Sequence, residues 1–236
     1  AIHIHSLYAN SEYEIIESKS KLETALATQI RGFVTPGNQY NYPAVFAFRN
    51  LYAAIYTVIS GVNSSFPNLY KLKRNPINDS TDYRLIDETA AGRGWLIDYS
   101  HLISAGNSTF SNKDISEAGL EARWKYIIEN YSERFWNAAS DEICDYIRIR
   151  NSVKLKRFCN TQNSLTFMIC LKNIKKCKYK FLTLIITPPD EFICNNITVA
   201  YNGNSNNCKI DRRGTKYLVT INLQNDIGEI TVTYER

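Results

Sequence analysis

Residues 164–187 read SLTFMICLKNIKKCKYKFLTLIIT, and this stretch decides the class of fold. Two apolar runs of strand length flank a lysine-rich connection, and β-branched and aromatic residues are frequent in both runs. Similar runs recur at 191–202, 216–223 and 229–235, with turn residues between them. The pattern predicts an antiparallel, β-rich part at the C-terminal end.

The preceding residues favour helices. Residues 11–31 and 114–131 keep apolar side chains at helical spacing. Ser111 and Asp114 are expected to cap the second of these helices. Its buried face is expected to hold four residues: Trp124, Ile128, Tyr131 and Phe135. For residues 43–62, a buried helix and a pair of strands remain alternatives.

The sequence therefore predicts an α+β fold. A mainly helical part over residues 1–158 is followed by a disulfide-bonded, antiparallel β part over residues 159–236. No flexible linker marks the boundary, so one continuous domain is the alternative. The chain of 236 residues is long enough for either arrangement.

The cysteines indicate an exported protein. All six lie in the last part of the chain, at Cys144, Cys159, Cys170, Cys177, Cys194 and Cys208. They show no Cys-x-x-Cys spacing, so disulfides are favoured over a metal site, although 15 pairings are open. A secreted chain starting at Ala1 after signal removal would fit this interpretation. Five sequons are then expected to carry glycans: Asn63, Asn78, Asn107, Asn130 and Asn196.

Charge and motifs limit the classes of function. The net charge is +5, and basic residues concentrate between Arg148 and Lys216, which suits RNA or an anionic membrane as well as a solvated face. The sequence lacks the Gly-rich motifs that bind nucleotides, so no cofactor is expected. No apolar run is long enough to form a transmembrane segment. The only histidines are His3, His5 and His101, and His5 with His101 is the one pair suited to acid–base chemistry.

One helical segment carries a more specific signal. Residues 115–127 read ISEAGLEARWKYI, and the segment 83–92 upstream reads YRLIDETAAG. Together they resemble the active-site helix and the Tyr-x-Arg-Leu…Ala-Gly stretch of ribosome-inactivating RNA N-glycosidases. The resemblance implies that Tyr83 stacks on an adenine, that a glutamate stabilises the ribosyl cation, and that Arg123 protonates the leaving base.

The identity of the glutamate stays open. The family places it three residues before the arginine, one helical turn away, and that position is Leu120 in this chain. Glu121 and Glu117 are therefore both candidates.

Three functions are expected on these grounds. The first is a secreted, toxin-like adenine N-glycosidase that acts on RNA or the ribosome. One alternative is a non-catalytic secreted binding protein that recognises a host or cell-surface partner, or a carrier protein. The other alternative is a histidine-dependent ribonuclease toxin.

Overall fold

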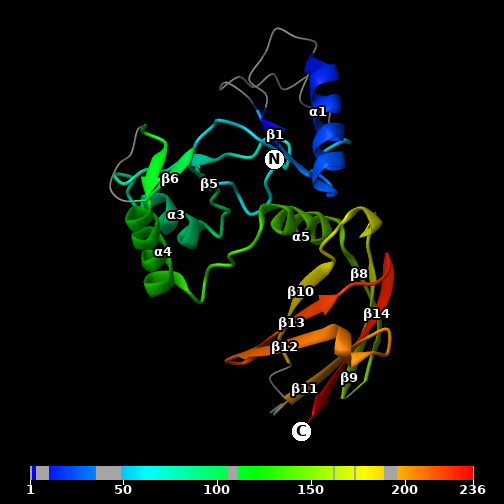
Figure 1. Ribbon diagram of the computed structural model, residues 1–236. Helices are drawn as coiled ribbons and strands as arrows, with labels where there is room; N and C mark the ends of the chain where they lie inside the picture. The colour runs from blue at the N-terminus through cyan, green and yellow to red at the C-terminus, as the bar shows by residue number, and fades with distance from the viewer. Residues whose placement is uncertain are drawn as a thin grey trace. The chain divides into compact units, whose positions relative to one another are not determined.

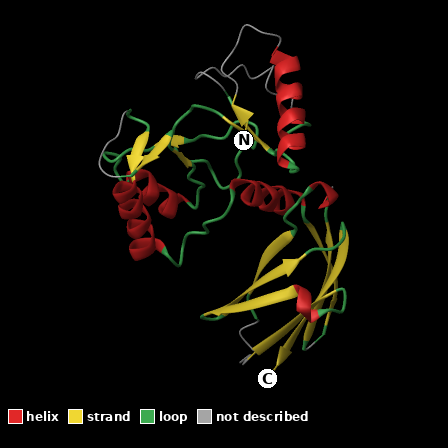
Figure 2. Ribbon diagram, viewed as in Figure 1, coloured by secondary structure: helices red, strands yellow, loops and turns green. Residues whose placement is uncertain are grey.

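The computed structural model describes residues 2–3, 11–35, 49–105, 111–161, 163–172, 174–188 and 196–235. The chain divides into two compact units, Ala1–Asp141 and Glu142–Arg236, called here the N-terminal unit and the C-terminal unit. Helices and short parallel strands make up the first unit, whereas antiparallel strands dominate the second (Figures 1 and 2). The predicted α+β class is confirmed, with helices and short parallel strands first and antiparallel sheets at the C-terminal end.

The N-terminal unit combines helices with short, separate pieces of sheet. One sheet has the order β1-β2-β3, and two further pairs are β4-β5 and β6-β7, all of them parallel. Its helices among the described residues are α1 (Ser11–Leu26), α3 (Arg84–Gly92) and α4 (Glu117–Tyr131). Its strands are β1 (Ile2–His3), β2 (Gly32–Val34), β3 (Ala54–Tyr56), β4 (Asn75–Pro76), β5 (Asp98–Tyr99), β6 (Leu102–Ser104) and β7 (Asp114–Ser116).

A small apolar cluster holds the first sheet against α1. Ile15 of α1 packs with Phe33 of β2 and Ile55 of β3, and Tyr52 completes the buried group. The Phe33 and Tyr52 rings lie 5.3 Å apart between centroids. Within the stretch 43–62, residues 49–62 are described and form the short strand β3 and no helix, whereas residues 43–48 lie outside the described residues.

The C-terminal unit is a two-sheet β sandwich with one core. Its sheets have the orders β11-β14-β9-β8 and β10-β13-β12, and each is antiparallel throughout. Side chains from both sheets, together with Ile149, form a single buried cluster. The strands are β8 (Lys154–Asn160), β9 (Ser164–Cys170), β10 (Phe181–Ile186), β11 (Asn196–Tyr201), β12 (Cys208–Arg213), β13 (Lys216–Asn222) and β14 (Ile227–Glu235).

Short helical segments complete this unit. Helix α5 (Ser140–Ser152) enters it, and the 3-10 turns η2 (Ile174–Lys176) and η3 (Ser205–Asn207) lie between strands. Helix α5 contributes Ile149 to the β core, and the division between the two units falls in its first turn, between Asp141 and Glu142. The sequence predicted a boundary at 158/159.

Two strands of the C-terminal unit were absent from the sequence prediction. Strand β8 reads KLKRFCN and β12 reads CKIDRR, so charged residues interrupt the apolar alternation in both. Each strand pairs with one neighbour only and forms a sheet edge. Charged residues are typical of edge strands because they discourage pairing with another chain.

Helix α4 differs from its prediction in its start and in its buried face. Residues 114–116 form β7, and the helix is capped by Ser116 instead of Ser111: the Ser116 hydroxyl accepts a hydrogen bond from the Gly119 amide at 3.0 Å. The buried face is formed by Arg123 and Ile127. Trp124 and Ile128 are 45% and 60% exposed, so their predicted burial is wrong.

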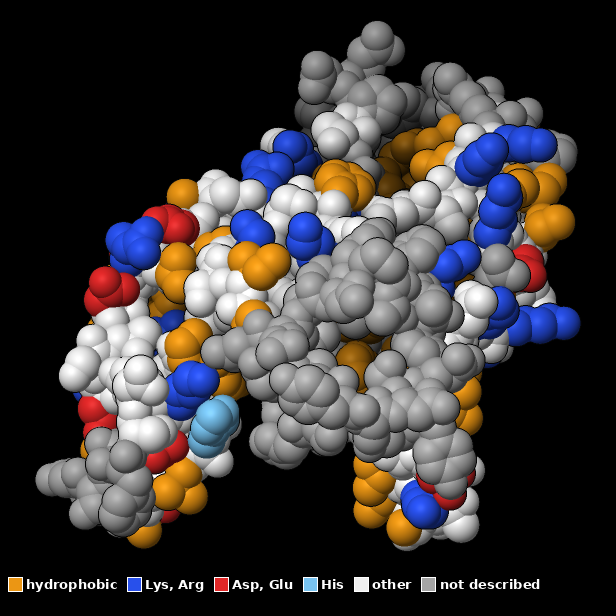
Figure 3. Space-filling view, turned by 90° about the horizontal axis from the view of Figure 1, so that it is seen from above, with side chains coloured by type: hydrophobic (Ala, Val, Ile, Leu, Met, Phe, Trp, Pro, Cys, Tyr) orange, Lys and Arg blue, Asp and Glu red, His pale blue; other side chains and the backbone are white. Residues whose placement is uncertain are grey.

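Exposed hydrophobic side chains are a general feature of the described surface. Figure 3 shows them lying among charged side chains on one face of the molecule. Tyr131 and Phe135, which were also predicted to be buried, are only partly covered. None of the described helices is both long and apolar enough to cross a membrane.

The structure joins no two of the five described cysteines by a disulfide. Cys144 and Cys177 are buried, Cys170 and Cys208 are partly covered, and Cys159 is exposed. Cys194 lies outside the described residues. The three predicted disulfides therefore stay a prediction.

Candidate functional site

The site begins at the N-terminus of α4, which is fixed to a loop upstream. Asp79 accepts hydrogen bonds from the Ser116 amide at 2.9 Å and from the Ser116 hydroxyl at 2.8 Å. A Cβ at Gly119 would overlap the Asp79 carboxylate, so glycine allows this close approach. These contacts fix where the next turn of α4 places Arg123.

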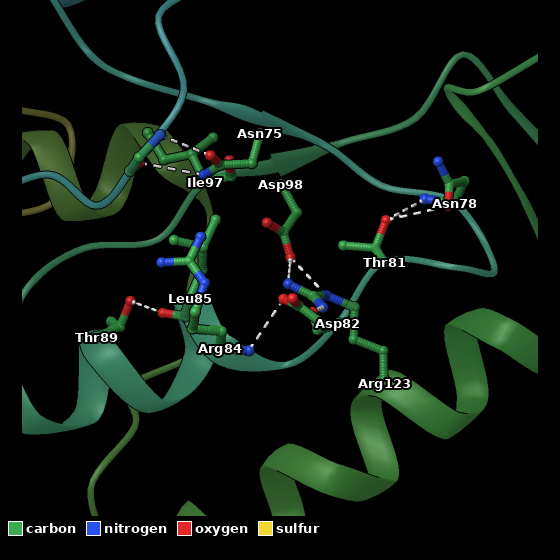
Figure 4. Close-up of polar contacts among 11 residues, drawn as sticks. Asn75, Asn78, Thr81, Asp82, Arg84, Leu85, Thr89, Ile97, Asp98 and Arg123 are labelled. Carbon is green, nitrogen blue, oxygen red and sulfur yellow. Dashed lines mark hydrogen bonds and ion pairs between the residues drawn. The ribbon is translucent and has the colours of Figure 1, made fainter.

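Arg123 forms a buried ion pair with Asp98, the first residue of β5 (Figure 4). The Arg123 side chain is only 6% exposed, and that of Asp98 is 22% exposed. Nε and Nη2 of Arg123 lie 2.8 Å and 2.7 Å from Oδ2 of Asp98. Nη1 donates to the backbone carbonyl of Asp82 at 3.3 Å, which brings the segment before Tyr83 to the same guanidinium.

The two oxygens of Asp98 have different surroundings. Oδ2 accepts from Arg123, whereas Oδ1 is buried without a hydrogen-bond partner among the described residues. Burial raises the pKa of the Asp98 carboxyl above its ordinary value, and the Arg123 guanidinium opposes that rise. The site therefore holds a carboxylate with one oxygen fixed and the other able to accept a hydrogen bond.

Tyr83 follows Asp82, whose carbonyl binds Arg123, and stacks on a second tyrosine. The rings of Tyr83 and Tyr126 are 4.2 Å apart between centroids. The hydroxyls of Tyr126 and Tyr131 both donate to Oδ1 of Asp87 at 2.8 Å. The bond from Tyr126 raises the pKa of that residue to about 12, and the bond from Tyr131 likewise raises the pKa of Tyr131.

The structure separates the two glutamates from the site. Glu117 and Glu121 are exposed on α4 and form no hydrogen bond or ion pair with any described residue. The carboxylate next to Arg123 is Asp98, 25 positions upstream. No motif indicated Asp98, because the pairing of β4 with β5 and the packing of α4 bring it into place.

The histidine pair is not assembled in the described part of the chain. His101 is exposed, and its ring lies 6.0 Å from the Tyr99 ring. His5 and the side chain of His3 lie outside the described residues. Nor do the described residues hold a group of three or more His, Cys, Asp and Glu side chains arranged for a metal ion.

The predicted glycosylation sites differ in accessibility. Asn63 is buried; its amide donates to the Lys73 and Trp95 carbonyls and accepts from the Lys73 amide, so a glycan there would break these bonds. Asn130 and Asn196 are exposed and Asn78 is partly exposed. Asn107 lies outside the described residues.

Comparison with protein families, curated proteins and solved structures found no match for this chain. The candidate site therefore rests on its own geometry.

Proposed function

We propose that the N-terminal unit hydrolyses the N-glycosidic bond of an adenosine in RNA, with Asp98 and Arg123 as the reacting pair. One observation carries this proposal: Arg123 holds one oxygen of a largely buried carboxylate, and the other oxygen has no hydrogen-bond partner among the described residues. A buried acceptor with no donor costs about 1–3 kcal/mol, so its retention favours a functional role over a purely structural one.

Asp98 would supply the negative charge that the reaction requires. When the bond between C1′ and adenine breaks, the ribose becomes cationic, and a nearby carboxylate stabilises it. Oδ1 would accept a proton from the attacking water while the water oxygen bonds to C1′. A pKa raised by burial favours this base, because a base is most effective when its pKa approaches the working pH.

Arg123 and Tyr83 would act on the adenine. A guanidinium has five N–H donors, and three groups of Arg123 already bind Asp98 and the Asp82 carbonyl. One of the remaining hydrogens would pass as a proton to the departing base, and the proton that Asp98 takes from the water would return to Arg123. Tyr83 offers an aromatic ring for stacking, in the role that the resemblance to RNA N-glycosidases implies.

The test measures adenine release from ribosomes and from a short RNA. Asp98→Asn keeps the shape of the side chain but removes its charge, and we expect it to lower the rate at least about 100-fold. Arg123→Lys should be similarly impaired, because an ammonium lacks the planar fork of donors. Tryptophan fluorescence checks that both variants stay folded.

Matched variants separate the alternatives. Glu121→Gln and Glu117→Gln should keep full activity, and a loss there with an active Asp98→Asn would contradict the role of Asp98. Strand scission that disappears in His101→Ala, with Arg123→Lys fully active, would establish the histidine nuclease instead. A wild-type protein that does neither reaction would support the non-catalytic secreted binding protein.

We also propose that the protein is secreted and that its cysteines form disulfides, beginning with Cys144–Cys177. Asp145 follows Cys144, and its Oδ2 accepts a hydrogen bond at 2.8 Å from the amide of Lys178, the residue after Cys177. This bond brings the two cysteine-bearing segments together, and both cysteines are buried. Peptide mapping without reducing agent, after equilibration with oxidised glutathione as the electron acceptor, should find this pair. Recovery of both as alkylated thiols would contradict the pairing.

A further inference from the structure

The connection between β9 and β10 presents four exposed lysines: Lys172, Lys175, Lys176 and Lys178, called here the lysine loop. None of the four forms an ion pair with an acidic residue in the described part of the chain. Two apolar residues between them are buried, Ile174 at 1% exposed and Cys177 at 7%. The loop therefore turns its apolar side chains inward and its charges outward.

Two carboxylates fix the backbone of the loop. Asp226 accepts a hydrogen bond from the Ile174 amide at 2.8 Å. Asp145, which is 0% exposed, accepts from the Lys178 amide at 2.8 Å and the Tyr179 amide at 3.1 Å. Because both carboxylates bind backbone groups of the loop, the lysines are held on an ordered surface. An ordered loop loses less conformational entropy when it binds a partner.

The positive charge of the chain is also concentrated in the unit that contains the lysine loop. The C-terminal unit contains 15 Lys and Arg against 8 Asp and Glu, a net charge of +7. The N-terminal unit contains 13 against 15, a net charge of −2. The basic character of the protein therefore belongs to the unit that contains the lysine loop, and a polyanion is the partner that such a field attracts.

We propose that the lysine loop binds the phosphate backbone of RNA, which deepens the proposed function by adding a binding surface for the same substrate. Lysine suits this role because it is a point charge that contacts phosphates without reading sequence. Tyr179 is partly exposed, and its ring lies 5.0 Å from Nζ of Lys178, so an unpaired base has an aromatic face on which to stack.

The composition of the loop favours RNA over a membrane. Binding at a lipid surface combines basic residues with apolar side chains that insert between headgroups. Here the apolar residues Ile174 and Cys177 point into the core and are not available for insertion. Apart from the partly exposed Tyr179, the exposed part of the loop is thus cationic, which matches a phosphate backbone.

The test compares two double variants of the full chain for binding to a fluorescent single-stranded RNA. Lys175→Gln with Lys176→Gln changes the loop. Lys209→Gln with Lys216→Gln removes the same charge from exposed positions on β12 and β13. We expect the loop variant to bind about tenfold more weakly than the control, and its salt dependence to fall by about 1.4 in slope, since each lost phosphate contact removes about 0.7.

The possible results separate the role of the lysine loop from the proposed catalytic function. Equal weakening in the two variants, or no RNA binding by the wild type, would overturn the proposal. Loss of phosphatidylserine-vesicle binding in the loop variant, with RNA binding unchanged, would assign the loop to membranes. Because this readout is binding, it is independent of catalysis: a wild type that binds RNA through the loop but releases no adenine would remove only the proposed function. Normal RNA binding by the loop variant, together with adenine release by the wild type, would remove only the role of the loop.

Discussion

The two units bury different kinds of side chain. Among the described residues, eleven of the twelve buried polar or charged residues lie in the N-terminal unit, and Asp145 is the exception. Buried hydrophobic residues in the described part of the chain number 13 in the N-terminal unit and 20 in the smaller C-terminal unit. The C-terminal unit therefore depends on apolar packing, whereas the N-terminal unit depends heavily on internal hydrogen bonds. A buried charge is costly unless it is paired, so the polar interior is also where function is expected.

Short strands explain the polar interior of the N-terminal unit. Strands of two or three residues leave many backbone groups without a ladder partner, and such groups need another partner when they are buried. Asn75 provides one by accepting from the Gly61 amide at 2.7 Å and donating to the Gly61 and Ile97 carbonyls. The Asn63 side chain likewise accepts from the Lys73 amide and donates to the Lys73 and Trp95 carbonyls. Side-chain amides replace ladder bonds that the short strands cannot make.

The largest effect is expected at the buried ion pair. Arg123→Met should lower the free energy of unfolding of the N-terminal unit by about 3–5 kcal/mol, because it leaves the Asp98 carboxylate buried without its partner. All three tryptophans, Trp95, Trp124 and Trp136, lie in this unit, so urea unfolding followed by tryptophan fluorescence measures it. Lys125→Met, at an exposed position of the same helix, is the control. Equal stability of the two variants would mean that the pair contributes nothing to the fold.

The second-largest effect on the free energy of unfolding is expected in the apolar core of the C-terminal unit. Ile230, in the interior strand β14, is 0% exposed and lies between Phe167 and Tyr201 in register. Ile230→Ala should cost about 2–5 kcal/mol through lost contacts and a residual cavity. Ile227→Ala changes the same residue type at the start of β14, where the side chain is 61% exposed, and should stay within about 0.5 kcal/mol. Urea unfolding followed by far-ultraviolet circular dichroism measures the contrast, and similar losses in both would show that the core lies elsewhere.

A smaller loss of stability is expected for a substitution where β14 meets β11. A Cβ at Gly228 would overlap the ring of Tyr201, which is 0% exposed. Gly228→Ala should therefore cost about 1–3 kcal/mol through overpacking. Gly92 in α3 has no neighbour within 4 Å of an added Cβ, so Gly92→Ala should be neutral or slightly stabilising. Thermal unfolding of the two variants tests this, and an unchanged midpoint for Gly228→Ala would contradict the close contact.

The smallest effect is a dependence on alkaline pH in the N-terminal unit. The bond to Asp87 favours the neutral Tyr126 hydroxyl, so its stabilising contribution is complete below the ordinary pKa of about 10 and is lost as the pH rises through about 12. Tyrosinate absorbance should show the corresponding late titration. Asp87→Asn should shift this step toward lower pH, and an unchanged titration curve would show that the hydrogen bond is not formed.

Prediction from sequence succeeded where one kind of residue repeats at a regular spacing. Strands β9, β10, β11 and β13 fall within the predicted runs, and β14 begins two residues before its run, because alternating or continuous apolar residues are visible locally. The edge strand β8 was missed because its lysines conceal the alternation. The buried face of α4 was misplaced, because an arginine at its centre looks like a surface residue until Asp98 neutralises it.

The sequence by itself determined the α+β class and the change from helical to strand spacing, and it indicated Arg123 and Tyr83 as candidates for a site. These properties depend on residues near one another in the chain. Only the tertiary structure decided which carboxylate meets Arg123, since Asp98 reaches it through the β4–β5 pairing and the anchoring of α4 on Asp79. A contact between distant residues depends on how elements pack, and a single sequence has no local signal for that packing.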